Sequence, residues 1–308
     1  MELSVEIGKR TLKNPVGVAS GTFGYGQEFD SIMDLSKLGA IYTKAISMEP
    51  RQGNPTPRIV ETPSGMLNAI GLQNVGVEAF VAEKLPFLSQ LDTAVIVNVA
   101  GYTDDDYCNV VKRLDDHEAV WGYEINLSCP NVKVGAIQFG TDPDMVEQVT
   151  TKIRAFTQKP LMVKLSPNVT DIAEIAMAAE RGGADAVSCI NTLVGMVIDV
   201  ESQKTVLANK TGGLSGPAIR PVGVRMTHQV SRAIDIPVVG IGGITGADDA
   251  IQYLLAGAKA IQVGTWNFIE PGSSENIADG IAAYMEKHGI QNINGFAALL
   301  DRTESGKT

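Results

Sequence analysis

The sequence predicts an α/β fold, a single (β/α)8 or TIM barrel with a small N-terminal β-hairpin. Eight short runs rich in Val, Ile and Ala recur along the chain, and amphipathic segments fill the gaps between them. No linker or low-complexity tract interrupts this series. Because α/β barrels commonly occupy chains of this length, we expect residues 1–308 to form one domain.

The eight apolar runs are the expected barrel strands. They lack regular polar alternation, as strands do when both of their faces are covered. The expected strands are residues 15–19, 40–47, 94–100, 122–127, 161–165, 186–190, 237–241 and 260–263. Eight units of a strand followed by a helix favour a closed barrel over an open, doubly wound sheet.

Helices are expected between the strands, at residues 77–91, 145–157, 171–181, 217–233, 247–256 and 276–288. Asp142-Pro143 is a typical start for the second of these, and Gly182-Gly183 is a typical stop for the third. The acidic run 104–106 indicates a further, solvated helix start. Residues 3–7 and 10–12 should form the hairpin at the bottom of the barrel.

Composition excludes several classes of function. The three cysteines, Cys108, Cys129 and Cys189, are odd in number and form no CxxC pair, so neither disulfides nor a metal site is expected. A formal net charge of −10 without a basic stripe argues against nucleic-acid binding. The N-terminal residues lack an apolar run long enough for a signal peptide or membrane span, so we expect a cytoplasmic protein.

Polar residues gather where the expected strands end, which is where such barrels place their active sites. Turn preferences explain most of the glycines and one or two asparagines, but not two lysines and three asparagines that leave apolar strands toward one rim. Buried amides and ammonium groups need hydrogen-bond partners, which a polar, planar ligand would supply. The residues at these ends are Ser20-Gly21, Lys44, Asn98, Asn126, Cys129, Lys164, Asn191-Thr192, Gly242-Gly243 and Gly264-Thr265.

Glycine-rich segments follow the last two expected strands, at residues 240–246 and 263–265. This position is the usual phosphate site of a barrel, because backbone N–H groups at helix starts point toward the anion. Tight turns between strands and helices would also explain glycines here. The chain contains no Rossmann fingerprint for NAD or FAD.

Cys129 differs in position from the other two cysteines. Cys108 and Cys189 fit small, buried apolar residues, whereas Cys129 lies just past a strand in a proline-bounded loop between two asparagines. A thiolate there can act as a base or nucleophile. None of the three histidines falls at a strand end, so a Cys–His dyad is not expected. Position alone leaves a structural role and a proton-transfer role open.

The segment Asn126-Leu-Ser-Cys129-Pro-Asn131 resembles the signature loop of class 1 dihydroorotate dehydrogenases, which carries their catalytic cysteine. The resemblance covers nearly the whole chain, and further matches fall in family order. They are Ala19-Ser20-Gly21, Thr43-Lys44, Gly53-Asn54-Pro55-Thr56-Pro57-Arg58, Asn68-Ala-Ile-Gly71-Leu72, Val163-Lys164-Leu165-Ser166-Pro167, Ile190-Asn191-Thr192, Gly213-Leu214-Ser215-Gly216 and Gly240-Ile-Gly242-Gly243-Ile244.

The resemblance implies one FMN per chain and oxidation of dihydroorotate to orotate in de novo pyrimidine (UMP) biosynthesis. It implies that Cys129 is the catalytic base and that Lys44 and Lys164 act beside the flavin, Lys164 by stabilising negative charge on the reduced ring. The implied cofactor-binding residues are Ser20, Lys44, Ala45, Asn98, Asn126, Lys164, Ile190 and Gly216, with Gly242, Gly243, Gly264 and Thr265 at the phosphate. The implied substrate-binding residues are Lys44, Asn68, Ala69, Ile70, Gly71, Leu72, Asn126, Asn131, Asn191 and Thr192.

Within the family, the chain resembles the catalytic (FMN) subunit of class 1B. Membrane-bound class 2 enzymes use serine as the base and carry an extra N-terminal helical segment, and residues 191–199 resemble class 1B rather than fumarate-using class 1A. The resemblance implies that electrons reach NAD⁺ through a partner subunit with FAD and a [2Fe–2S] cluster. The expected assembly is a heterotetramer of two copies of each chain around a homodimer core.

Three alternatives remain at this point. A class 1A enzyme would work alone and reduce fumarate. The pyrimidine-reducing domain of a dihydropyrimidine dehydrogenase shares much of the Cys129 loop, but it needs iron–sulfur cysteines that this chain lacks. A non-catalytic barrel that binds a phosphorylated ligand would explain the glycines but leave Lys44, Lys164 and the Cys129 loop unexplained.

Overall fold

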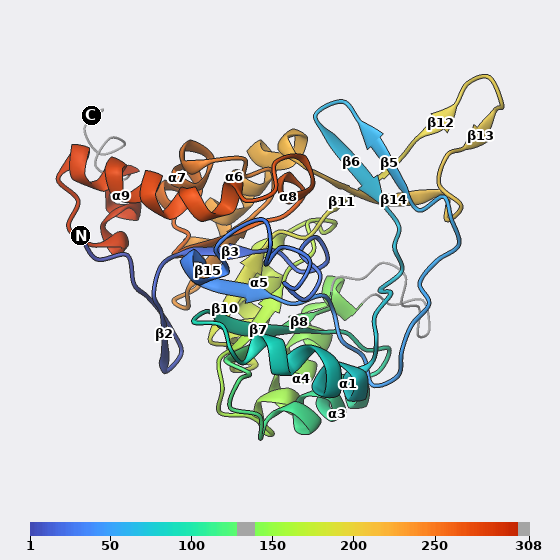
Figure 1. Ribbon diagram of the computed structural model, residues 1–308, viewed down its shortest axis with the longest axis horizontal. Helices are drawn as coiled ribbons and strands as arrows, with labels where there is room; N and C mark the ends of the chain where they lie inside the picture. Colours follow the sequence, from blue (N-terminus) through green and yellow to red (C-terminus); the bar gives the residue numbers. More distant parts are fainter. Residues whose placement is uncertain (128–138, 301–308) are drawn as a thin grey trace.

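The computed structural model describes residues 1–127 and 139–300. Eight parallel strands close into a barrel in chain order, and Ile261 of the last strand pairs with Val16 of the first (Figure 1). The strands are β3 (Val16–Val18), β4 (Ala40–Tyr42), β7 (Ala94–Val99), β8 (Gly122–Asn126), β9 (Leu161–Lys164), β10 (Ala186–Cys189), β15 (Val238–Ile241) and β16 (Ala260–Val263). The predicted barrel and its eight strands are confirmed.

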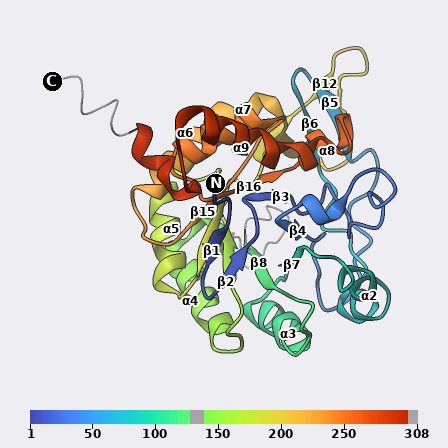
Figure 2. The same cartoon turned by 60° about the vertical axis from the view of Figure 1, so that its left-hand side comes forward.

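Helices surround the barrel, as Figure 2 shows. They are α3 (Asp104–Leu114), α4 (Pro143–Arg154), α5 (Ile172–Arg181), α6 (Arg220–Ser231), α7 (Ala247–Leu255), α8 (Trp266–Ile269) and α9 (Ile277–His288). Asp142 caps α4 by accepting hydrogen bonds from the two backbone N–H groups of Asp144 and Met145. Thr103 and Asp106 form a capping box at the start of α3.

The predicted helix 77–91 is distorted and shorter than expected. It consists of α1 (Val77–Ala79), a π-helical turn (η2, Phe80–Lys84) and α2 (Leu85–Leu88). Pro86 explains the distortion, because proline lacks the N–H that a regular helix interior requires.

The first strand is not followed by an α-helix, so the expectation of eight complete strand-then-helix units was wrong. Its connection to β4 contains only the 3₁₀ turn η1 (Leu35–Lys37), and buried side chains such as Phe23 and Phe29 fill the space. The other 3₁₀ turns are η3 (Phe139–Thr141), η4 (Pro217–Ile219), η5 (Ser273–Asn276) and η6 (Ile293–Gly295).

The N-terminal hairpin is confirmed as β1 (Val5–Ile7) paired with β2 (Arg10–Leu12). A second, four-stranded antiparallel sheet was not predicted. Its order is β11 (Leu193–Met196), β14 (Thr211–Ser215), β6 (Gly65–Asn68) and β5 (Ile59–Thr62). The small hairpin of β12 (Ile198–Asp199) and β13 (Lys204–Thr205) extends from it at the upper right of Figure 1. No helix in the described ranges is long and apolar enough to cross a membrane.

Candidate active site

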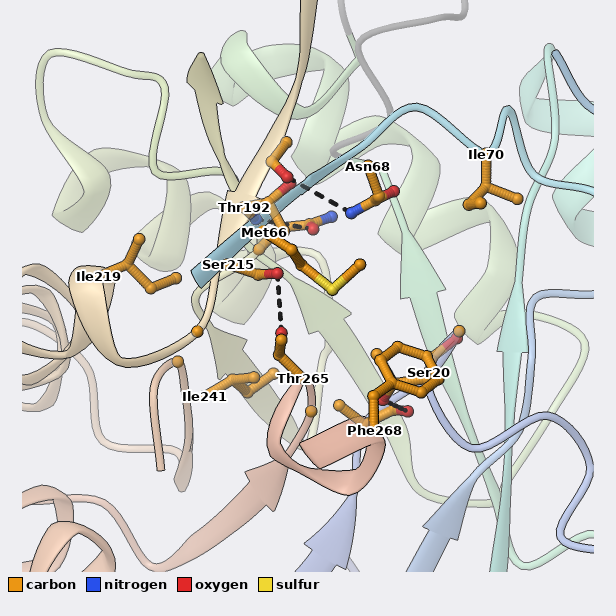
Figure 3. Close-up of a pocket in the computed structure, with 18 of the residues that line it drawn as sticks. Ser20, Met66, Asn68, Ile70, Thr192, Ser215, Ile219, Ile241, Thr265 and Phe268 are labelled. Atoms are coloured by element: carbon orange, nitrogen blue, oxygen red, sulfur yellow. Dashed lines mark hydrogen bonds between the residues drawn. The ribbon is translucent and has the colours of Figure 1, made fainter. Parts of the chain in front are cut away.

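A cavity of about 270 Å³ lies where the barrel strands end and the second sheet begins (Figure 3). The carboxyl ends of the barrel strands and the segments that follow them supply much of its wall, including Lys44, Asn126 and Lys164. The second sheet supplies Met66 and Asn68 from β6 and Ser215 from β14. The sheet that sequence patterns missed therefore forms one side of the cavity.

Most residues predicted for the site lie on this cavity wall. They are Ser20, Lys44, Ala45, Asn68, Ala69, Ile70, Gly71, Leu72, Asn126, Lys164, Ile190, Asn191, Thr192, Gly216, Gly242, Gly243, Gly264 and Thr265. Asn98 is not on the wall but is fully buried inside the barrel. Cys129 and Asn131 lie outside the described residues.

Several residues on the wall were not predicted as part of the site. Met66, Ser215, Ile219 and Phe268 are among them, and Figure 3 shows Ser215 and Thr265 pointing toward one another. The Thr265 hydroxyl donates a hydrogen bond of 2.7 Å to Ser215 Oγ. Ser215 belongs to the motif Gly213-Leu214-Ser215-Gly216 noted above. Its place on the cavity wall depends on the second sheet, which the sequence patterns did not predict.

Lys44 brings an unpaired ammonium group to the cavity. Its backbone N–H donates to Gly24 O at 2.8 Å, while its Nζ forms no hydrogen bond or ion pair with any residue the structure describes. Burial lowers the pKa of Lys44, and the positive charge of Arg58 lowers it further. A ligand carboxylate would offset both effects.

Lys164 ends β9 and is 6% exposed. Its Nζ lies 3.6 Å from Oε2 of Glu124, a fully buried carboxylate on the neighbouring strand β8. This places a paired cation, rather than an isolated one, in the wall of the cavity.

Asparagine amides also line the cavity. Asn191 Nδ2 donates to Asn126 Oδ1 at 3.4 Å, and Asn191 Oδ1 accepts from Thr192 N at 2.8 Å. Asn68 Nδ2 donates to Gly213 O at 3.4 Å. A bond of this length is weak, so the Asn68 amide can turn to a planar ligand that offers better geometry.

The glycine-rich ends of β15 and the following loop have backbone conformations that few other residues adopt. Gly242 and Gly243 have φ of 129° and 67°, and a Cβ on Gly243 would lie 2.8 Å from Gly216 O. The loop is held by Asp249 of α7, which accepts from Thr245 N at 3.0 Å and from Thr245 Oγ1 at 2.6 Å. Its N–H groups can thus face an anion at the start of α7.

A closed barrel with lysines, amides and glycine-rich loops at the carboxyl ends of its strands is the arrangement of a TIM-barrel enzyme. The chain belongs to the dihydroorotate dehydrogenase family, whose model matches residues 2–285.

Comparison with individual relatives identifies the subgroup of the family that the chain resembles. The chain is 56% identical over 300 residues to "Dihydroorotate dehydrogenase B (NAD(+)), catalytic subunit" of Pelobacter propionicus, covering 97% of this chain and 99% of the relative. It is 57% identical over 299 residues to the protein of the same description from Geotalea daltonii, covering 97% and 98%. The predicted resemblance to a class 1B catalytic subunit is confirmed.

Among solved structures, DHODH from Eimeria tenella, crystallised with ferulenol, matches with a TM-score of 0.80 at 24% identity. The match covers 98% of this chain and 89% of that one, and at this identity it supports the fold alone.

Proposed function

We propose that this chain is the FMN-containing catalytic subunit that oxidises dihydroorotate to orotate in pyrimidine biosynthesis, with NAD⁺ as the final electron acceptor. The observation that carries the proposal is one cavity that gathers the residues assigned separately to cofactor and substrate. Those residues come from distant parts of the chain, so their meeting in one place is not a consequence of sequence order.

The described residues fit FMN on two observations. Gly216, Gly242 and Gly243 form a cradle with little room for side chains, which suits close approach of a phosphate to the backbone. Inside the barrel, Asn98 Oδ1 is buried without a hydrogen-bond partner, as expected of a group reserved for a ligand or water. Bound FMN would accept a hydride from carbon 6 of the substrate and so supply the redox chemistry.

Other residues of the cavity wall would bind and orient the substrate. Dihydroorotate carries a carboxylate and ring amides. Lys44 offers the carboxylate an ammonium that has no partner among the described residues, and the amides of Asn68, Asn126 and Asn191 are of a type that can both donate to and accept from the ring. Such a site would disfavour analogues that leave these amides unpaired.

Cys129 is the proposed base, which would take a proton from carbon 5. This assignment rests on the resemblance of residues 126–131 to the family loop, because Cys129 lies outside the described residues. A thiol ionises at much lower pH than a hydroxyl, which suits proton abstraction near neutral pH.

Electron transfer to NAD⁺ would require a second subunit. The sequence holds neither a Rossmann fingerprint nor a cysteine set with iron–sulfur spacing. We therefore propose a cytoplasmic heterotetramer, with two copies of this chain as the central dimer and one FAD- and [2Fe–2S]-containing subunit bound to each.

Steady-state assays with the purified chain and a dye acceptor test the proposal against its rivals. Dihydroorotate should be oxidised, dihydrouracil should not, and fumarate should not replace the dye. Oxidation of dihydrouracil would favour the dihydropyrimidine dehydrogenase-like alternative, and rapid fumarate reduction would favour class 1A. Inactivity with dihydroorotate in a folded, FMN-loaded protein would contradict the proposal.

A further inference from the structure

Glu124 is a fully buried carboxylate in the barrel interior, and it does not line the cavity. Successive residues of a strand face opposite sides, so Glu124 and Asn126 of β8 both face inward. Three more buried polar groups lie around it: Asn98 and Lys164 on the neighbouring strands β7 and β9, and Gln262 on β16, which is not adjacent to β8 in the barrel.

Both oxygens of Glu124 have buried partners. Oε2 accepts from Asn98 Nδ2 at 2.6 Å and lies 3.6 Å from Lys164 Nζ. Oε1 accepts from Gln262 Nε2 at 2.7 Å. The carboxylate thus connects four barrel strands directly beneath a lysine that lines the cavity.

An ionised carboxylate can only accept hydrogen bonds, so it dictates how the two amides turn. Asn98 and Gln262 must each present their NH₂ group to Glu124. Their carbonyl oxygens, Asn98 Oδ1 and Gln262 Oε1, are left buried without a hydrogen-bond partner among the residues that the structure describes. The arrangement fixes both amides in one orientation, and it leaves an acceptor rather than a donor free on Asn98.

We propose that Glu124 is a positioning residue of this site, the counter-ion that places the Lys164 ammonium, partly neutralises its field and so sets the midpoint potential of the bound flavin. The proposal rests on the proposed FMN chemistry and goes beyond it, because it assigns a role to a residue that touches neither cofactor nor substrate. Glu124 acts through Lys164.

The direction of the effect follows from the charges. A cation beside a ring that gains electrons favours the reduced form, and a carboxylate 3.6 Å from that cation draws it away and offsets its charge. Replacing Glu124 by the isosteric glutamine removes the negative charge that offsets the Lys164 ammonium. The midpoint potential of the flavin should therefore rise.

A double-mutant cycle tests this route. The midpoint potential is measured by spectroelectrochemistry on the FMN-loaded parent, Glu124→Gln, Lys164→Met and the double variant. If Glu124 acts through Lys164, Glu124→Gln raises the potential clearly in the parent and much less when Lys164 is already methionine. Equal shifts in both backgrounds, a lowered potential, or no shift would overturn the proposal.

Asp185→Asn is the matched control. Asp185 is a carboxylate paired with a cation, Arg154, at 2.7 Å, but it precedes β10 at the other end of the barrel. Its conversion to the amide should leave the flavin potential unchanged. A shift as large as that of Glu124→Gln would contradict a local role for Glu124.

Glu124→Gln leaves Lys164 buried without this carboxylate, and removing one member of a buried ion pair can prevent folding. In that case the double variant Glu124→Gln with Lys164→Met, which leaves neither charge, should recover the fold. A double variant that stays unfolded contradicts the proposal. A parent chain that folds but cannot bind FMN would contradict the proposed function instead, so the two failures are distinguishable.

Discussion

At the scale of single residues, Lys44 shows how burial prepares a charged group for a ligand. Its ammonium lines the cavity without a partner among the described residues, and burial holds its pKa below the usual range. Burying this charge lowers the stability of the folded chain when no ligand is bound. Function and stability are therefore opposed at Lys44.

Replacing Lys44 by methionine should stabilise the FMN-free protein at neutral pH, because methionine buries no charge. The pKa of Lys44 is lower in the folded than in the unfolded chain. Between those two pKa values the unfolded chain binds more protons, so the parent's free energy of unfolding rises with pH. The advantage of Lys44→Met should shrink as the pH approaches the ordinary lysine value of about 10.4.

Urea unfolding of both apoproteins at several pH values measures this advantage. Lys9→Met, at an exposed lysine, is the control. The interpretation of Lys44 fails if the parent is the more stable protein at neutral pH, or if its difference from Lys44→Met is constant across the series.

Replacing Cys129 by alanine should slow flavin reduction by dihydroorotate ~10²–10⁴-fold while FMN stays bound, because a positioned base is lost. Stopped-flow absorbance measures the rate. Cys108→Ala is the matched control, since Cys108 is buried among apolar residues of α3. Equal damage from Cys108→Ala with little effect from Cys129→Ala would show that the base was assigned to the wrong cysteine.

Most of the cavity residues could be predicted from the sequence, because they stand in short polar motifs directly after apolar strands and can be recognised without knowing the fold. They did not find a role for Glu124, although it lies only two residues before the Asn126–Asn131 segment. Its partners Asn98 and Gln262 are 26 and 138 residues away in the chain, and only the closed barrel brings them together. Met66 was missed for the same reason, since β6 becomes part of the cavity wall only by pairing with β14, far along the chain.

At the scale of elements, the barrel strands were predictable because each is a continuous apolar run with both faces covered. The second sheet was not, because β14 is Thr-Gly-Gly-Leu-Ser and pairs with β6 from far along the chain. A local signal existed only for β5 and β6, two short runs joined by Pro63-Ser64. Helix 77–91 was overextended because apolar spacing does not register Pro86.

The start of α7 carries a testable prediction about the phosphate loop. Asp249 holds this loop through two hydrogen bonds to Thr245 and an ion pair of 2.5 Å with Arg220. Asp249→Ala should weaken FMN binding about 10- to 100-fold, in keeping with ~1.5–3 kcal/mol for hydrogen bonds to a charged group. The flavin potential should stay the same, because the change is remote from Lys164.

Fluorescence titration of the apoprotein with FMN gives this affinity. The neighbouring Asp248 is exposed, so Asp248→Ala tests whether loss of a nearby negative charge alone matters. If both variants bind FMN equally well, the loop does not depend on Asp249.

At the scale of the whole molecule, the fold provides the cavity proposed to bind FMN, but the sequence contains no motif for binding NAD⁺. The closed barrel and the position of the cavity could be predicted from local patterns in the sequence. The proposed electron-transfer partner could not, because a surface that binds a partner has no periodic sequence pattern. Its prediction rests on family resemblance alone.

The purified chain should therefore form no NADH from dihydroorotate and NAD⁺. Adding the FAD- and [2Fe–2S]-containing subunit should restore NADH formation, with a mass corresponding to two copies of each chain by light scattering. Rapid NADH formation by the rigorously purified single chain would contradict both the partner and the class 1B mechanism.

The central claim is that dihydroorotate delivers its electrons to an FMN held in the cavity at the end of this barrel. The visible absorption spectrum of the purified chain, recorded without oxygen before and after adding dihydroorotate, tests it most directly. The account predicts a yellow protein with about one FMN per chain, whose flavin absorbance bleaches on addition of dihydroorotate. A folded protein that cannot be loaded with FMN, or a bound flavin that stays oxidised with excess dihydroorotate, would contradict it.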